Sequence, residues 1–235
     1  MKTLGALALA ATTLAVPAGA VELTGGAVEL GYSAFTEETD VNRTILRGQA
    51  ELGFTRNFAA QVDAGYYGYH YLGDGVNLTA HGIYHGSETA SFGVYVGYDE
   101  IESVSATTYG LEAGMLLAPS VIAEVYAGGF DIEGEGGLMM GVEVANAFGN
   151  GLSARAGIDH VNSDFGVDVT SIELGLDYKV TPQTGLYAEV GSTRLSGFGA
   201  SGSETYVGAG VTIDFGAKRG ATFGYRSLFD LIPGL

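Results

Sequence analysis

The chain has 235 residues, of which 27 are acidic and 10 are basic, and it contains no cysteine. The net charge of −17 disfavours a nucleic-acid partner, because phosphate binding requires a basic surface, and a disulfide framework is excluded. Since 46% of the residues are nevertheless hydrophobic, the charged and the apolar residues must be sorted onto different surfaces.

The N-terminus has the features of an export signal. Lys2 provides a short positive region, residues 4–14 are apolar, and Ala18-Gly19-Ala20 fits a small-residue cleavage site. The apolar stretch is too short to span a bilayer, and no later stretch reaches the length of a transmembrane helix. We therefore expect residues 1–20 to be a signal peptide that is removed, so that the mature chain starts at Val21.

From residue 21 to residue 215 the hydrophobicity alternates with a period of two. Along residues 169–180, for example, Leu174 and Leu176 fall on one face and Glu173 and Asp177 on the other. This alternation predicts β-strands. Most of the alternating segments are ten to twelve residues long, which suits tilted membrane strands of about nine to eleven residues. Twelve strands are predicted, at 24–35, 44–55, 58–72, 76–85, 90–99, 106–117, 120–130, 138–147, 152–161, 169–180, 185–195 and 204–215.

The connections between these segments alternate in length. Longer, mostly acidic loops are predicted at 36–43, 99–105, 131–137, 162–168 and 196–203, with 73–75 as a short exception. Short turns are predicted between them, at 56–57, 86–89, 118–120, 149–151 and 181–184. Short periplasmic turns and longer extracellular loops are typical of bacterial membrane barrels. An even number of strands then places both termini in the periplasm.

The last predicted strand carries a recognisable ending. Residues 210–215, Gly-Val-Thr-Ile-Asp-Phe, resemble the closing-strand signal that the barrel-assembly machinery reads, so the barrel is expected to end at Phe215. Aromatic residues of the apolar face gather near strand ends, as interfacial girdles do. A secreted soluble β-sandwich or lipocalin-like barrel also alternates, but the long strands and aromatic ends favour the membrane.

By architecture, residues 21–215 resemble the porin-like outer-membrane β-barrel family of Gram-negative bacteria. The resemblance identifies no subfamily. It implies an all-β, transmembrane, antiparallel up-and-down barrel of about twelve strands in the bacterial outer membrane. Outer-membrane lipid, lipopolysaccharide and the barrel-assembly machinery are the partners that this resemblance implies.

If the apolar face meets lipid, the polar face lines the lumen. Eleven acidic residues and three basic ones fall on this inward face, so pairing cannot neutralise the acids, and we expect a wet, cation-preferring lumen. The residues assigned to pore selectivity are Arg47, Glu51, Asp63, Glu112, Glu124, Glu143, Asp159, Glu173, Asp177 and Glu189. Inward glycines are expected to leave room for a modest pore, and inward tyrosines either fill space or stack on solute rings.

Three functions remain open from the sequence. The favoured one is a non-enzymatic channel for passive diffusion of small hydrophilic solutes or cations. The second is a closed structural or surface-interaction barrel without transport, and the third is an outer-membrane hydrolase that uses a pair such as His85 and Ser91. No cofactor or metal is expected, since His81 and His85 are separated by roughly 13 Å of strand.

Residues 216–235 lack the strand pattern. Leu228 and Leu231 have helical spacing, but Pro233 interrupts any long helix. This segment is predicted to be a periplasmic tail, a plug that enters the lumen, or an additional pair of strands. We favour a tail that folds back toward the acidic lumen.

Overall fold

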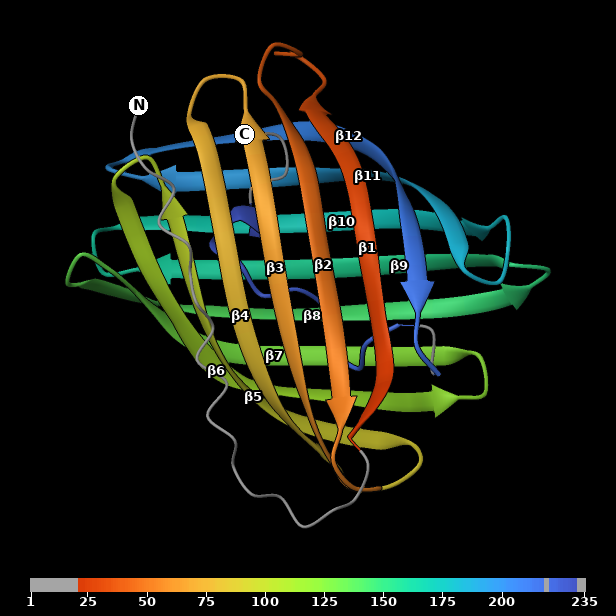
Figure 1. Cartoon of the computed structure of the whole chain (residues 1–235). Coiled ribbons are helices and arrows are strands. Elements are labelled where there is room, and N and C mark those ends of the chain that lie inside the picture. The colour runs from red at the N-terminus through yellow and green to blue at the C-terminus, as the bar shows by residue number, and fades with distance from the viewer. Residues whose placement is uncertain (1–20, 218–219, 232–235) are drawn as a thin grey trace, which may run out of the picture.

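The computed structural model describes residues 21–217 and 220–231, so the predicted signal peptide lies outside the described residues. Within these residues, twelve antiparallel strands form one closed sheet in which each strand pairs with its chain neighbours and β1 pairs with β12 (Figure 1). The predicted all-β up-and-down barrel is thus confirmed. The strands are β1 (Glu22–Phe35), β2 (Asn42–Gly53), β3 (Phe58–Tyr69), β4 (Gly73–His85), β5 (Ala90–Ile101), β6 (Val104–Ala118), β7 (Val121–Ile132), β8 (Glu135–Gly149), β9 (Leu152–Ser163), β10 (Val167–Lys179), β11 (Thr184–Gly197) and β12 (Ala200–Phe215).

The strands present an apolar face outward and a polar face inward. Along β4, Leu78 and Tyr84 are 43% and 46% exposed, whereas Thr79 and His81 are buried. In a closed barrel the strands satisfy one another's backbone hydrogen bonds. An apolar outer surface is the surface that such a barrel presents to lipid. Among the described residues, no helix is long and apolar enough to cross a membrane.

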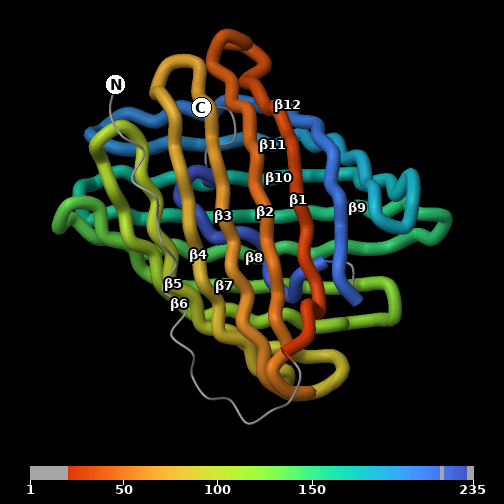
Figure 2. The backbone as a smooth tube through the Cα atoms, in the orientation of Figure 1, coloured from red at the N-terminus to blue at the C-terminus, as the bar shows by residue number. Residues whose placement is uncertain are grey.

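The start of β1 and the end of β12 lie at one end of the barrel, which we call the terminal end, and the opposite end is the far end. The chain that follows β12 enters the lumen of the barrel. Figure 2 shows this dark blue stretch inside the ring of strands. Its described part, residues 220–231, is called the tail segment below, and it ends in a short 3-10 helix, η1 (Leu228–Leu231).

The predicted long loops at the far end are wrong in four of five cases, and within 162–168 only residues 164–166 connect the strands. Within 99–105, 131–137 and 196–203, the strands extend until only residues 102–103, 133–134 and 198–199 connect them. Glu133-Gly134 and Phe198-Gly199 have positive φ at both positions, which is the conformation of a tight two-residue hairpin turn. The strands are consequently twelve to sixteen residues long, and the loops at the two ends differ little in length.

Several of the inward glycines do not widen the lumen as predicted, because tyrosine rings lie over them. A Cβ added to Gly110 or Gly128 would contact the ring or hydroxyl of Tyr95, and one added to Gly210 would contact Tyr187. Large rings on some strands are therefore accommodated by glycines on their neighbours. The inward tyrosines fill space within the barrel.

Candidate functional site: the lumen and the tail segment

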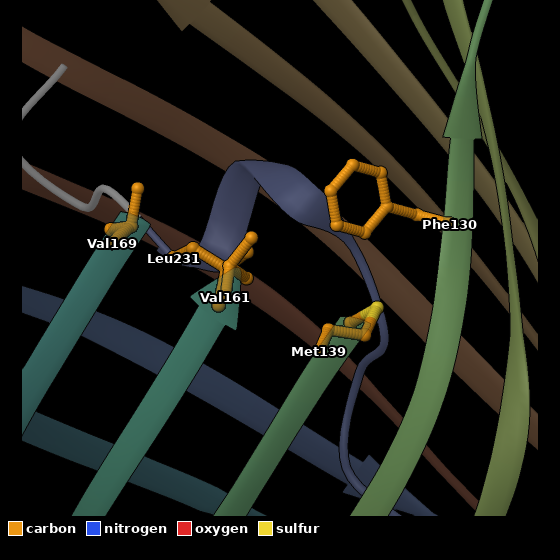
Figure 3. Close-up of a cluster of buried hydrophobic side chains, with 5 residues drawn as sticks. All are labelled: Phe130, Met139, Val161, Val169 and Leu231. Atoms are coloured by element: carbon orange, nitrogen blue, oxygen red, sulfur yellow. The ribbon is translucent and has the colours of Figure 1, made fainter. Parts of the chain in front are cut away.

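The tail segment runs along the lumen from the terminal end to the far end. Gly220 lies against Gly25 near the start of β1. At the other extreme, Leu231 packs into a buried apolar cluster with side chains near the far ends of β7 to β10 (Figure 3). The members of this cluster are Phe130, Met139, Val161, Val169 and Leu231.

Inward polar side chains bind the backbone of the tail segment. Glu51 accepts a hydrogen bond from the backbone N–H of Thr222 at 2.8 Å, and Gln61 exchanges two hydrogen bonds with the backbone of Phe223. Buried backbone groups must find partners, and the barrel wall supplies them through its side chains.

Nearer the far end the wall holds the tail segment in the same way. Asp99 accepts hydrogen bonds from the hydroxyl of Ser227 at 2.9 Å and from the backbone N–H of Leu228 at 2.8 Å. Thr79 donates to the carbonyl of Arg226 at 2.8 Å, and Arg43 donates to the carbonyl of Phe229. The tail segment therefore has side-chain partners along its length rather than an apolar contact alone.

Arg226 is the cation of the tail segment, and it is almost completely buried. Its guanidinium forms ion pairs with Glu124 and, at 3.2 Å, with Glu112. It also lies over the ring of Tyr126, 4.4 Å from the centroid, and 6.0 Å from that of Tyr95. We call Glu112, Glu124, Tyr95 and Tyr126 the arginine cage.

His81, on β4, links Glu112 of the arginine cage to Asp63 on β3. Its Nδ1 lies 2.7 Å from an oxygen of Glu112, and its Nε2 lies 3.0 Å from an oxygen of Asp63, with all three side chains fully buried. Only a doubly protonated imidazole can donate to both carboxylates. His81 thus bridges two acids that were predicted to face water.

Beside the tail segment lies a cavity of about 310 Å³, bounded mainly by the inward faces of β7 to β11 with β1 and β2. Among the described residues, eight carboxylates and four arginines line it. The carboxylates are Glu29, Glu124, Glu143, Asp159, Glu173, Asp177, Glu189 and Asp230, and the arginines are Arg43, Arg47, Arg155 and Arg226. The wall of this cavity therefore carries a surplus of negative charge.

Two of these arginines each hold more than one acid. Arg155 donates to Glu173, Asp177 and Glu189 at 2.9, 2.8 and 2.6 Å. Arg47 makes a bidentate pair with Glu29, at 3.0 and 3.1 Å, and also contacts Asp230 of the tail segment at 2.8 Å. Such charge-assisted contacts fix the arginines against the wall.

Two further acids of the cavity differ from these. Asp159 accepts a hydrogen bond from the hydroxyl of Tyr126 at 2.7 Å. Glu143 faces the cavity and forms no hydrogen bond or ion pair within residues 21–217 and 220–231. The residue is exposed within the barrel, so it is the acid of the cavity that is freest to interact with solutes.

The ten residues predicted to set selectivity fall into two groups. Seven line the cavity, namely Arg47, Glu124, Glu143, Asp159, Glu173, Asp177 and Glu189. The other three, Glu51, Asp63 and Glu112, are buried on the side that the tail segment and His81 occupy. Six of the predicted acids thus line the cavity, and the other three are buried against the tail segment or His81.

Two inward cations were missed from the sequence. Arg43 was assigned to a loop, but β2 begins at Asn42, two residues before the predicted start, and places this side chain inside, against Phe229. Arg226 lay in a segment without strand pattern. Position 43 continues the inward alternation of Arg47, so the period of β2 was the available signal.

The pair considered for hydrolysis also forms a contact. His85 Nδ1 lies 2.9 Å from the hydroxyl of Ser91 at the terminal end of β4 and β5. Asn57 donates to the backbone carbonyl of His85, which fixes the backbone of this turn. This contact lies outside the cavity of the lumen.

At the level of sequence, the chain matches no family model and no curated protein. Solved structures match its fold. A KdgM porin has a TM-score of 0.65 at 12% identity, over 80% of this chain and 99% of the porin. A NanC porin gives 0.60 at 10% identity, over 80% and 98% of the two chains. The COG4313 outer membrane channel from Pseudomonas putida F1 gives 0.57 at 14% identity, over 86% and 98%. The chain therefore has the fold of outer-membrane channel barrels.

Proposed function

We propose that the chain is a passive channel of the bacterial outer membrane that admits small hydrophilic solutes and prefers cations. The observation that carries the proposal is the lumenal cavity, in which eight carboxylates of the described residues face four arginines. A confined surplus of negative charge raises the local concentration of cations and repels anions. Lipid and lipopolysaccharide would surround such a barrel, and the barrel-assembly machinery would insert it.

The tail segment determines how large a solute this lumen admits. The cavity of about 310 Å³ beside the tail segment corresponds to roughly ten water molecules, at about 30 Å³ each. With the tail segment in place, the lumen suits hydrated ions and very small molecules. Larger solutes require the tail segment to move.

The structural neighbours support the coarser part of this proposal. KdgM and NanC are described as porins, and another neighbour, CymD, is described as a monoaromatic hydrocarbon channel, with a TM-score of 0.55 at 8% identity. None of these descriptions names a cation, so the preference for cations rests on the charges of this chain alone.

A planar-bilayer measurement on the full-length protein tests the function. In a KCl gradient we expect a reversal potential of the sign that marks cation preference. The preference should shrink as salt rises, because screening shortens to about 3 Å at 1 M. An anion-selective conductance would contradict the assignment.

The second candidate, a closed structural barrel, is favoured by the tail segment that fills one side of the lumen. It predicts no conductance in the wild-type protein. The same planar-bilayer measurement therefore distinguishes the two candidate functions.

A further inference from the structure

The arginine cage has the composition of a binding site for an organic cation. Two carboxylates approach the guanidinium of Arg226, one of them fully buried, while the rings of Tyr126 and Tyr95 face it. Carboxylates supply directional, charge-assisted hydrogen bonds, and aromatic faces attract cations. This combination favours a flat, weakly hydrated cation such as guanidinium over a small inorganic ion.

The barrel wall builds this cage, and the tail segment only fills it. Tyr95, Glu112, Glu124 and Tyr126 come from β5, β6 and β7, and glycines on neighbouring strands clear space for the two rings. His81 contacts Oε1 of Glu112, whereas Arg226 pairs with Oε2 of the same carboxylate. The cage is therefore supported by contacts that do not depend on Arg226.

The cage also opens toward the cavity of the lumen. Glu124, Tyr126 and Arg226 all belong to the lining of the cavity. A solute that enters the cavity reaches the cage without passing through the barrel wall.

We propose that the cage is a recognition site for solutes that carry a guanidinium or a similar organic cation, and that Arg226 occupies it as a tethered competitor. The proposal deepens the channel function proposed above by naming a solute class. A cationic solute that displaces Arg226 would loosen the tail segment and enlarge the lumen that it then crosses. The tail segment would thus couple passage to the chemistry of the solute.

The first test measures binding without transport. The full-length Arg226→Ala variant in detergent micelles is titrated calorimetrically with N-ethylguanidinium, which reproduces the end of an arginine side chain. N-ethylurea, which has a similar shape and no charge, is the matched control. We expect the variant to bind the cation roughly tenfold or more tightly than the urea, and the Arg226→Ala/Glu124→Gln variant to lose this difference. Equal binding of the two compounds by Arg226→Ala would overturn the proposal.

The second test keeps Arg226 and reads the position of the tail segment. The chain has no cysteine, so Ser227→Cys introduces one thiol at a position that is 3% exposed. At matched ionic strength, N-ethylguanidinium should accelerate maleimide labelling of this thiol, whereas N-ethylurea and NaCl should not. A tethered competitor has an effective concentration on the order of millimolar, so the titration must extend well beyond it. Labelling that N-ethylguanidinium does not accelerate would count against displacement.

These readouts separate the two proposals. Neither calorimetry nor labelling requires the barrel to conduct, so a failed channel assignment leaves them interpretable. Conversely, a cation-preferring conductance with no selective binding of N-ethylguanidinium by Arg226→Ala would retain the channel and discard the cage.

Discussion

The ring of Phe223 lies stacked against the imidazole of His81, with the ring centroids 6.4 Å apart and the planes inclined by 18°. Phe223 is almost fully buried and also packs with Ala59 and Ile83. This is an apolar anchor of the tail segment at the terminal end, as Leu231 is at the far end. The docking of the tail segment therefore depends on burial as well as on the hydrogen bonds described above.

Replacing Phe223 by Ala should loosen the tail segment while the barrel stays closed. Removing a buried phenylalanine ring costs about 3–5 kcal/mol in a protein core, and here the loss weakens a docked segment rather than a strand pairing. We expect a larger single-channel conductance and faster labelling of the Ser227→Cys thiol. The matched control is Phe198→Ala, at a turn position that is 89% exposed, which should change neither quantity. Unchanged conductance and labelling in Phe223→Ala would show that this anchor does not hold the tail segment.

The fold could be predicted from the sequence because each strand of a membrane barrel shows its alternating pattern within its own short segment. Alternation along a strand assigns each residue to lipid or lumen, so both the number of strands and their faces followed from it. The strand ends were less predictable, since acidic residues such as those around Glu133 were read as a loop. The turn that actually forms uses Glu133-Gly134, where glycine tolerates positive φ, and this local signal was overlooked.

The interior of the barrel was harder to predict than its wall. The period of two places Glu51 and Glu112 inside, but it does not reveal that Thr222 and Arg226 will meet them. Those contacts join residues more than a hundred positions apart, through a segment with no repeating pattern. The surplus of inward acid was a usable clue, because it implied that cations from elsewhere in the chain would be attracted to the lumen.

The outward face of β8 provides a test of the register. Val142 is exposed near the middle of the strand, so Val142→Arg should cost roughly 2–4 kcal/mol of folding free energy at the bilayer midplane. Leu138→Arg, on the same face but near the far end, should cost only about 0–1 kcal/mol at the interface. Reversible urea unfolding in lipid vesicles measures both. A larger loss at Leu138 than at Val142 would mean that the bilayer is centred elsewhere on this strand.

Gly128 tests whether tyrosine packing limits the width of the lumen. A Cβ at this position would overlap the carbonyl oxygen of Tyr109 and crowd the hydroxyl of Tyr95, so Gly128→Ala should destabilise the barrel by roughly 1–3 kcal/mol. Gly157→Ala is the control, because its added methyl would meet only a carbonyl oxygen at 3.7 Å. Unfolding of the two variants is compared under the same conditions. If they were equally stable, both the backbone at Tyr109 and the ring of Tyr95 would have to shift to admit the added methyl group.

Glu143 offers the most direct test of selectivity, since its carboxylate faces the cavity and holds no partner within the part of the chain that the structure describes. Glu143→Gln removes one negative charge without breaking an ion pair, whereas Glu173→Gln would also remove one of the three ion pairs of Arg155. We expect Glu143→Gln to fold normally and to shift the reversal potential in a KCl gradient toward zero. The shift should be largest at low salt, because at 0.1 M a charge is screened over about 10 Å. Glu88→Gln is the matched control: this residue lies at an exposed turn of the terminal end, paired with Arg56, and should leave the potential unchanged. If both variants retained the wild-type potential, the selectivity would have to arise from acids other than Glu143. The paired cluster around Arg155 would then be the next group of side chains to neutralise.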